Sequence, residues 1–202
     1  MVCAPGACWS YAHTNFVILG KVLEKATGKS LAQMIFDRVL RPLSLKDTRS
    51  EDTPIIQEPV LHAFDAERGR YEESTYWNPS WTLAHGAIMT TNTADVLKSA
   101  VMLGTGSLLS SESHRLQLAP LTVGLKPWTN KSYYGLGIAV TNGWLSLMPS
   151  FAGYAATMNY LPSRKLAIAV SVTTEERASM DGNLAKEIAR DVAAYMAPEA
   201  PL

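Results

Sequence analysis

The sequence predicts an α+β fold in which helices flank an antiparallel sheet, and three observations support this class. Apolar residues recur at helical spacing at 17–26, 31–39 and 96–101 in the first half of the chain. Between residues 134 and 172 the apolar period changes to two, which is typical of β-strands. The apolar row from Leu184 to Met196 then returns to helical spacing. Helices, then strands, then a covering helix give the α+β class.

Two helices near the start are predicted to form a hairpin. The first begins near Thr14 and ends at Gly28, because glycine commonly follows the last residue of a helix. Its apolar side chains are expected to face a core. Ser30 with Gln33 three residues later is a capping box, so a second helix begins there and ends before Pro42.

The middle of the chain is predicted to hold loops and two more helices. Residues 43–79 are polar and have no regular period, so we expect loops with short pieces of structure. Long loops of this kind often line functional sites. A third helix is expected from Asn92 or Thr93 to Gly104, and a shorter one over Ser110–Leu118.

Three strands are predicted at 134–140, 154–161 and 166–172, joined as an antiparallel meander. Small residues alternate with large ones in the first and last of them, which leaves a nearly bare sheet face where a helix can lie close. The final helix is expected to pack on the sheet through Leu184, Ile188, Val192 and Met196, and residues 197–202 are expected to fray. We divide the chain into a mainly helical and loop region, 1–128, and a region of strands and the final helix, 129–202.

Charge and composition favour small molecules or proteins as partners, and the family resemblance given below narrows this to a small-molecule or peptide substrate. The chain has 18 basic and 18 acidic residues, which gives it none of the electrostatic footprint that nucleic acid or an anionic membrane selects. No apolar stretch approaches the roughly 18 residues that a membrane span needs. We therefore predict neither a nucleic-acid partner nor a membrane span.

Two cysteines, Cys3 and Cys8, flank the turn-forming Ala-Pro-Gly-Ala. This spacing suits a small disulfide loop just ahead of Tyr11, which would imply an exported, oxidising setting. Two reduced thiols are the alternative. A zinc site that adds His13 is disfavoured, because structural zinc sites have four ligands and usually show paired C-x₂₋₄-C spacing, and no metal or cofactor is predicted.

Four stretches, taken in order, carry a resemblance to a known family. They are PGACWSYAHTNFVILGKVLEKATGKS, AHGAIMTTNTADVLKSAVMLGTGSLLS, YYGLGIAV and GYAATMNYLPSRKLAIAVSVT. Together they resemble the serine β-lactamase and DD-peptidase superfamily, in particular the class C branch with its related carboxypeptidases and esterases. The resemblance implies a β-lactamase/transpeptidase-like fold, incomplete at its N-terminus, and hydrolysis of an ester or amide such as a β-lactam or a D-amino acid peptide. It also favours a periplasmic or extracellular location.

The chemistry of that superfamily is acyl transfer through the serine of a Ser-x-x-Lys motif. No serine of this sequence is followed three residues later by lysine. Since the resemblance places this motif before the tyrosine motif, we expect it in a missing N-terminal segment upstream of Met1, and we expect the chain alone to be inactive. The alternative is a non-catalytic module that keeps the fold and binds ligands; a structural protein without a ligand is a third possibility.

The resemblance also implies roles for individual residues. Tyr11 matches the catalytic tyrosine that takes or relays the serine proton, and His13 stands where the family has a substrate-binding asparagine. The family's third motif, His/Lys-x-Gly, would fall at Leu147-Met148-Pro149, which supplies no cation. Gly153 and Tyr154 follow it and are expected to bind substrate.

Trp144 is also expected to approach the substrate, because some esterase-like relatives use a tryptophan-led motif. We expect Tyr11 and His13 at one end of a groove whose other wall is residues 144–153 and an edge strand at 154–161. The competing interpretations are a tyrosine that packs in the core and a histidine that lies on the surface. Other residues that might line a cleft are His62, Trp77, Trp81 and His85, although loop aromatics more often serve packing.

Overall fold

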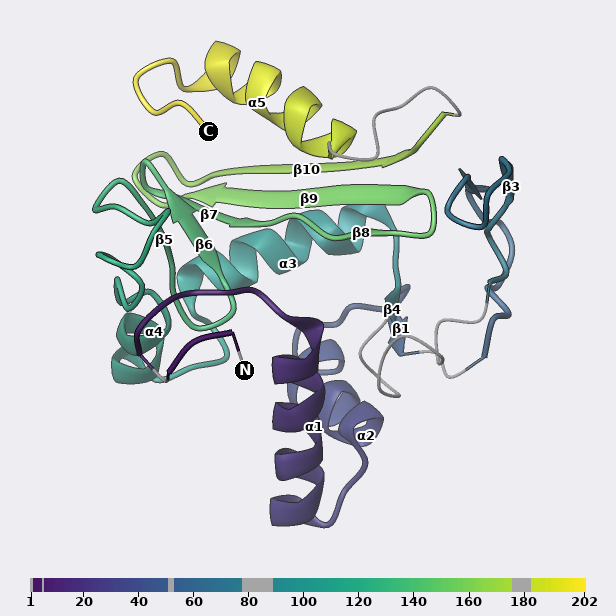
Figure 1. The fold of residues 1–202 in the computed structure, drawn as a ribbon, viewed down its shortest axis with the longest axis horizontal. Coiled ribbons are helices and arrows are strands. Elements are labelled where there is room, and N and C mark those ends of the chain that lie inside the picture. Colours follow the sequence, from purple (N-terminus) through teal and green to yellow (C-terminus); the bar gives the residue numbers. More distant parts are fainter. Residues whose placement is uncertain (1, 5, 51–52, 78–88, 176–182) are drawn as a thin grey trace.

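The structure is a computed structural model that describes residues 2–4, 6–50, 53–77, 89–175 and 183–202. Within these residues the main sheet has six strands in the order β10-β9-β7-β6-β5, with β8 also paired to β9. Figure 1 shows α5 along one face of this sheet and α3 along the other. The mixture of helices and antiparallel sheet confirms the predicted α+β class.

The helices are α1 (His13–Thr27), α2 (Leu31–Ile35), the π-helical turn η1 (Phe36–Leu40), α3 (Thr93–Thr105), α4 (Ser111–Gln117) and α5 (Leu184–Met196). The strands are β1 (Arg49–Ser50), β2 (Phe64–Asp65), β3 (Glu72–Glu73), β4 (Met89–Thr90), β5 (Ser132–Tyr134), β6 (Ala139–Thr141), β7 (Trp144–Leu147), β8 (Ser150–Phe151), β9 (Tyr154–Leu161) and β10 (Leu166–Thr173). The short strands β1, β2 and β3 confirm loops with small pieces of structure over the described residues 43–50 and 53–77.

Polar caps begin the helices where the sequence predicted. Ser30 Oγ accepts a hydrogen bond from the Gln33 amide at the start of α2, and Asn92 does the same for α3. Gly28 ends α1 in the left-handed conformation, with φ 70°, and its amide bonds to Glu24. These local hydrogen bonds fix the helix boundaries independently of tertiary packing.

The sheet contains more breaks than the sequence predicted. Residues 134–140 do not form one strand, because the chain turns at Gly135–Ile138, where Gly137 has φ 74° and Gly135 donates to the Ile138 carbonyl. The predicted meander paired the strand at 134–140 directly with the strand at 154–161. This pairing is wrong, because β7 lies between β6 and β9. β9 itself lies between β10 and β7 and is therefore not the edge strand that we expected.

The final helix packs through a different face from the predicted one. Ala185, Ala189 and Ala193 are fully buried against the sheet, whereas Leu184, Ile188, Val192 and Met196 remain about 40% exposed. The reason lies in the sheet, because its bulky face with Leu161 and Ile168 is the one that meets α5. Large side chains on the sheet leave room only for small ones on the helix.

On the opposite face of the sheet, where α3 lies, β10 presents the small Ala167 and β9 the large ring of Tyr160. Leu103 of α3 packs near Ala167 of β10, and a Cβ added to Gly104 would overlap the ring of Tyr160. The helix therefore approaches the sheet closely where the glycine of α3 makes room for the ring of Tyr160.

The apolar face of α1 is largely in solvent, which corrects the expectation of a buried helix. Ile18, Leu19 and Val22 are each more than half exposed, and Gly20 is the buried residue of this helix. Gly20 lies where α1 crosses α2, because an added Cβ would come within 2.9 Å of Leu31. In Figure 1 α1 extends away from the sheet, with α2 beside it.

Both ends of the described chain are fixed by bonds or by burial. Cys3 and Cys8 form a disulfide with their Cα atoms 6.2 Å apart, which confirms the predicted bridge. At the other end Ala197 is fully buried and the indole of Trp144 donates to the Ala200 carbonyl over 2.7 Å. The predicted fraying of 197–202 is therefore wrong. Among the described residues no helix is long and apolar enough to cross a bilayer.

Candidate active site

Tyr11 lies in the extended segment just before α1, and its ring is half exposed. The ring contacts His13 at 5.5 Å and Phe16 at 5.9 Å between centroids. Its hydroxyl makes no hydrogen bond to any of the residues that the structure describes. Tyr11 is thus an accessible phenol at the start of a helix, and the interpretation of it as a buried core residue does not fit.

His13 is the first residue of α1 and is exposed beside Tyr11. The two rings meet edge to face, with an interplanar angle of 89°. The two residues of the tyrosine motif thus lie side by side at the start of α1. A histidine at this position supplies a hydrogen-bond donor and an acceptor next to the phenol.

A cluster of larger aromatic rings supports Tyr11 from the sheet side. Tyr134 of β5 meets Tyr11 at 6.3 Å and Trp9 at 5.8 Å. Trp9 in turn lies 4.8 Å from Trp128 in an edge-to-face pair. Burial raises the pKa of Tyr134, and the nearby Tyr11 adds to this effect, so Tyr134 is a neutral phenol near neutral pH.

Sequence reasoning missed these supporting aromatic residues as part of the site. Trp128 and Tyr134 lie more than 110 positions after Trp9 along the chain, and no local pattern says that they meet. The adjacent Tyr-Tyr-Gly-Leu-Gly signal indicated only a strand. The contact depends on the tertiary fold.

Gly153 and Tyr154 lie at the turn between β8 and β9, where they meet the β2–β3 hairpin. The Tyr154 hydroxyl donates to the Leu61 carbonyl over 2.7 Å, and a Cβ on Gly153 would collide with the Phe64 carbonyl. Burial is the main cause that raises the pKa of Tyr154. Within the described residues, the ring of Tyr154 makes no contact with the ring of Tyr11.

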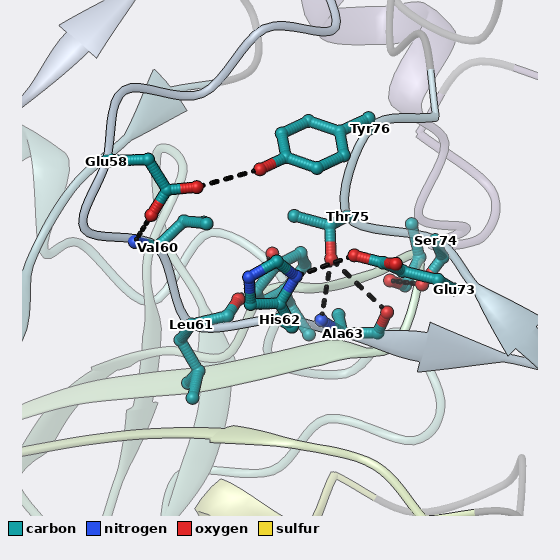
Figure 2. A network of polar contacts seen from close by, with 11 residues as sticks. Glu58, Val60, Leu61, His62, Ala63, Glu73, Ser74, Thr75 and Tyr76 are labelled. Carbon is teal, nitrogen blue, oxygen red and sulfur yellow. Dashed lines mark hydrogen bonds and ion pairs between the residues drawn. The ribbon is translucent and has the colours of Figure 1, made fainter.

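His62 belongs to the polar network on this hairpin, shown in Figure 2. Its Nδ1 lies 2.6 Å from Glu73 Oε1, and both side chains are about half exposed. Hydrogen bonds from His62 and then Thr75 hold the pKa of Glu73 below its ordinary value. Tyr76 donates to Glu58 over 3.1 Å, which raises the pKa of that phenol.

The Glu58–Tyr76 network fastens the hairpin rather than offering a reactive centre. Thr75 Oγ1 accepts from the Ala63 amide over 2.9 Å, and Ser74 Oγ donates to the Ala152 carbonyl over 2.7 Å. The hydroxyl groups nearest His62 are thus already engaged with the main chain. In Figure 2 these side chains link the two arms of the hairpin to each other.

Trp144 is a core residue, which corrects its predicted place in the substrate groove. Its side chain is fully buried against α5 with Leu161 and Ile168, and its indole is bonded to Ala200. A buried ring with a satisfied donor has no surface to offer a ligand. In the same region the Pro149 carbonyl accepts from Ala156, so the position of the third motif also serves the sheet.

The remaining candidates divide between packing and residues that lie outside the described structure. The ring of Trp77 stacks against the Arg68 guanidinium at 3.8 Å. Trp81 and His85, with the glycine-rich stretch that contains His85, fall outside the described residues. No group of three or more His, Cys, Asp or Glu side chains in the described part of the chain is placed to hold a metal ion.

Several proteins of known structure share this fold. A D-stereospecific amidohydrolase from Streptomyces sp. aligns with a TM-score of 0.74 and 24% identity, over 85% of this chain and 52% of that one. A penicillin-binding protein from Bacillus halodurans aligns with a TM-score of 0.78 and 17% identity, over 96% and 58%. A D-amino acid amidase from Ochrobactrum anthropi SV3 aligns with a TM-score of 0.71 and 20% identity, over 96% of this chain and 59% of that one. At these identities the likeness shows the fold.

The similarity in sequence is more local. A D-aminopeptidase from Brucella canis is 36% identical over 67 residues, which make up 33% of this chain and 13% of that protein. The chain thus spans only part of its relatives, about half in the solved structures and much less in this peptidase. The Beta-lactamase family model, however, matches residues 1–193. This chain is therefore a member of the β-lactamase family of serine hydrolases.

Proposed function

We propose that this chain forms the Tyr11-bearing part of a serine hydrolase that cleaves an amide or ester by acyl transfer. The observation that carries the proposal is the position of Tyr11 beside His13, as a half-exposed phenol whose hydroxyl bonds to none of the described residues. A catalytic acid-base group must reach the substrate and must not be locked in a structural bond. The exposure of its ring, and the lack of a hydrogen bond from its hydroxyl to the described residues, support this role for Tyr11.

In this proposal Tyr11 takes or relays the proton of a serine hydroxyl, and His13 contacts the substrate. The serine itself belongs to a Ser-x-x-Lys motif, which none of the serines of this sequence forms. The motif is carried by polypeptide outside these 202 residues, and this polypeptide is the chain's partner. Gly153 and Tyr154 remain proposed to border the substrate at the far end, on the side of the β2–β3 hairpin.

The proposed substrates are amides, esters or short peptides of D-amino acids. The names of the relatives support this class, since they include a D-aminopeptidase and a D-amino acid amidase. The absence of a cation at Leu147-Met148-Pro149 supports neutral groups at that end over a free carboxylate. The Cys3–Cys8 disulfide supports an exported protein.

Covalent labelling tests this assignment. The 202-residue chain is incubated with a fluorophosphonate and with a fluorescent penicillin, and its mass is measured. We expect no stoichiometric adduct, because no serine here has the lysine partner that activates it. An adduct on any serine would show that the nucleophile lies within the chain and would overturn the proposal.

A second candidate is a non-catalytic module that binds the same ligands. The lack of Ser-x-x-Lys in these 202 residues is as compatible with this module as with the hydrolase. The two candidates differ in the polypeptide encoded by the complete reading frame: the hydrolase turns over a D-amino acid amide, whereas the module binds the amide and leaves it intact. Mass spectrometry of the amide after incubation separates the two.

A further inference from the structure

We infer that Tyr134 is a positioning residue for Tyr11, whose ring it holds in place over the sheet. The inference deepens the proposed function and rests on it for the chemical role of Tyr11. The contact itself stands on the geometry alone.

Three aromatic partners surround Tyr11, and only one of them is independent of it. His13 and Phe16 belong to α1, which begins two residues after Tyr11, so these two contacts do not tie Tyr11 to the sheet. Tyr134 comes from β5, more than 120 positions later in the sequence. Among the ring contacts of the described residues, it alone ties Tyr11 to the sheet.

Tyr134 also holds the segment that leads into Tyr11. Its ring meets Trp9 at 5.8 Å and Trp128 at 6.2 Å. Trp9 and Tyr11 are two positions apart in an extended segment, where alternate side chains point the same way. One ring therefore receives both side chains, and the disulfide loop before Trp9 limits the freedom of that segment.

The backbone of Tyr134 is a fixed reference point. Its amide donates to Thr122 Oγ1 over 2.8 Å, and its carbonyl accepts from the same hydroxyl over 3.0 Å. β5 also pairs with β6 at this residue, opposite Ala139. Thr122 is itself buried, so movement of Tyr134 would break bonds in a buried place.

The turn after β5 lies beside the start of α1. A Cβ on Gly137 would lie 3.9 Å from the Phe16 ring, so this helix begins over the bare turn. The neighbouring Gly135 leaves no room for a side chain, because its added Cβ would collide with the Gln117 carbonyl. Tyr134 is the large side chain closest in sequence to this turn on its N-terminal side.

α1 gives Tyr11 little other support. The apolar face of the helix is mostly exposed, with contacts to α2 near Gly20 and Leu31. An edge-to-face ring pair biases the population of a ring position by roughly two- to tenfold. Where a segment has few other contacts, a bias of this size decides where the ring lies.

Nuclear magnetic resonance on the folded chain tests the inference without any need for activity. Tyrosine rings are isotope-labelled, Tyr11 is assigned with Tyr11→Phe, and cross-peaks between the Tyr11 and Phe16 rings report their distance. We expect Tyr134→Leu to reduce these cross-peaks at least twofold, and Tyr134→Phe, which keeps the ring, to restore them. Tyr195→Leu, at an 87% exposed position of α5, is the control.

The signals of Tyr160 in the core show whether each variant is still folded. If Tyr134→Leu is folded and the Tyr11–Phe16 cross-peaks keep their wild-type intensity, Tyr134 does not position Tyr11. A failure to restore the cross-peaks in Tyr134→Phe would equally overturn the inference, since the ring is what it assigns. Neither result depends on whether Tyr11 takes part in catalysis, so the proposed function is tested separately.

Discussion

The Tyr154 hydroxyl donates a hydrogen bond to the Leu61 carbonyl over 2.7 Å and so joins β9 to a hairpin 93 residues earlier. The neighbouring Gly153 packs against the Phe64 carbonyl, and Thr174 Oγ1 donates to that same carbonyl over 3.3 Å. The end of the sheet and the β2–β3 hairpin therefore form one joined surface.

Tyr154→Phe removes the bond to Leu61 and leaves its carbonyl without that donor. We expect the free energy of unfolding to fall by about 1 kcal/mol, the usual net contribution of one hydrogen bond. Urea unfolding measures it, and Tyr195→Phe on the exposed face of α5 should change nothing. Equal stability of wild type and Tyr154→Phe would mean that this contact does not hold the hairpin.

The acid limb of stability should depend on Glu73. Its pKa in the folded chain is lowered from 4.5, first by His62 and then by Thr75. A lowered folded pKa means that ionised Glu73 stabilises the fold above about pH 4.5 and that this contribution is lost as the pH falls through the folded pKa. Glu73→Gln should therefore flatten the fall of the melting temperature below that pH.

The control for Glu73 lies in the same hairpin. Glu67 is exposed, and its carboxylate makes no hydrogen bond to the described residues. Glu67→Gln should keep the wild-type acid limb. If Glu73→Gln also keeps it, the His62–Glu73 pair contributes nothing to stability.

The buried alanine face of α5 predicts an unusual sensitivity to larger side chains. Ala189→Leu should lower the free energy of unfolding by roughly 1 to 3 kcal/mol, because the added atoms have no space beside Leu161 and Ile168. Ile188→Ala should cost less, since much of that side chain is already in water. If urea unfolding shows a larger loss of stability for Ile188→Ala than for Ala189→Leu, the row from Leu184 to Met196 is the packed face, as the sequence alone predicted.

The Cys3–Cys8 bridge closes a loop of five residue steps. Loop-closure entropy assigns such a bridge about 2 kcal/mol of stabilisation. The double variant Cys3→Ala/Cys8→Ala should therefore unfold at lower urea than the oxidised chain, and reduction of the wild type should give the same shift. An unchanged midpoint would mean that the loop is open before the rest of the chain unfolds.

Local signals in the sequence predicted the elements that local bonds determine. The end of α1, the start of α3 and the end of β9 follow from a glycine after the helix, an asparagine cap and a tight turn after the strand. The disulfide followed from two cysteines around a turn. Each of these depends on residues close together in the chain.

The errors concern packing partners, which local patterns do not contain. The α5 row at Leu184 is the larger apolar row, but the sheet face opposite already holds bulky residues, so alanines pack there instead. Trp144 was expected in the groove and lies under α5, because an unpredicted strand places it on that face. The link between Tyr11 and Tyr134 was missed for the same reason.

The rate of amide hydrolysis with and without the Tyr11 hydroxyl tests the central claim most directly. The measurement uses the polypeptide encoded by the complete reading frame around these residues, with a D-amino acid amide as substrate. The account predicts turnover by the wild type, a kcat for Tyr11→Phe lower by roughly 10²- to 10⁴-fold, and no change for Tyr195→Phe. Wild-type kcat in Tyr11→Phe, or no turnover by the wild type, would contradict it.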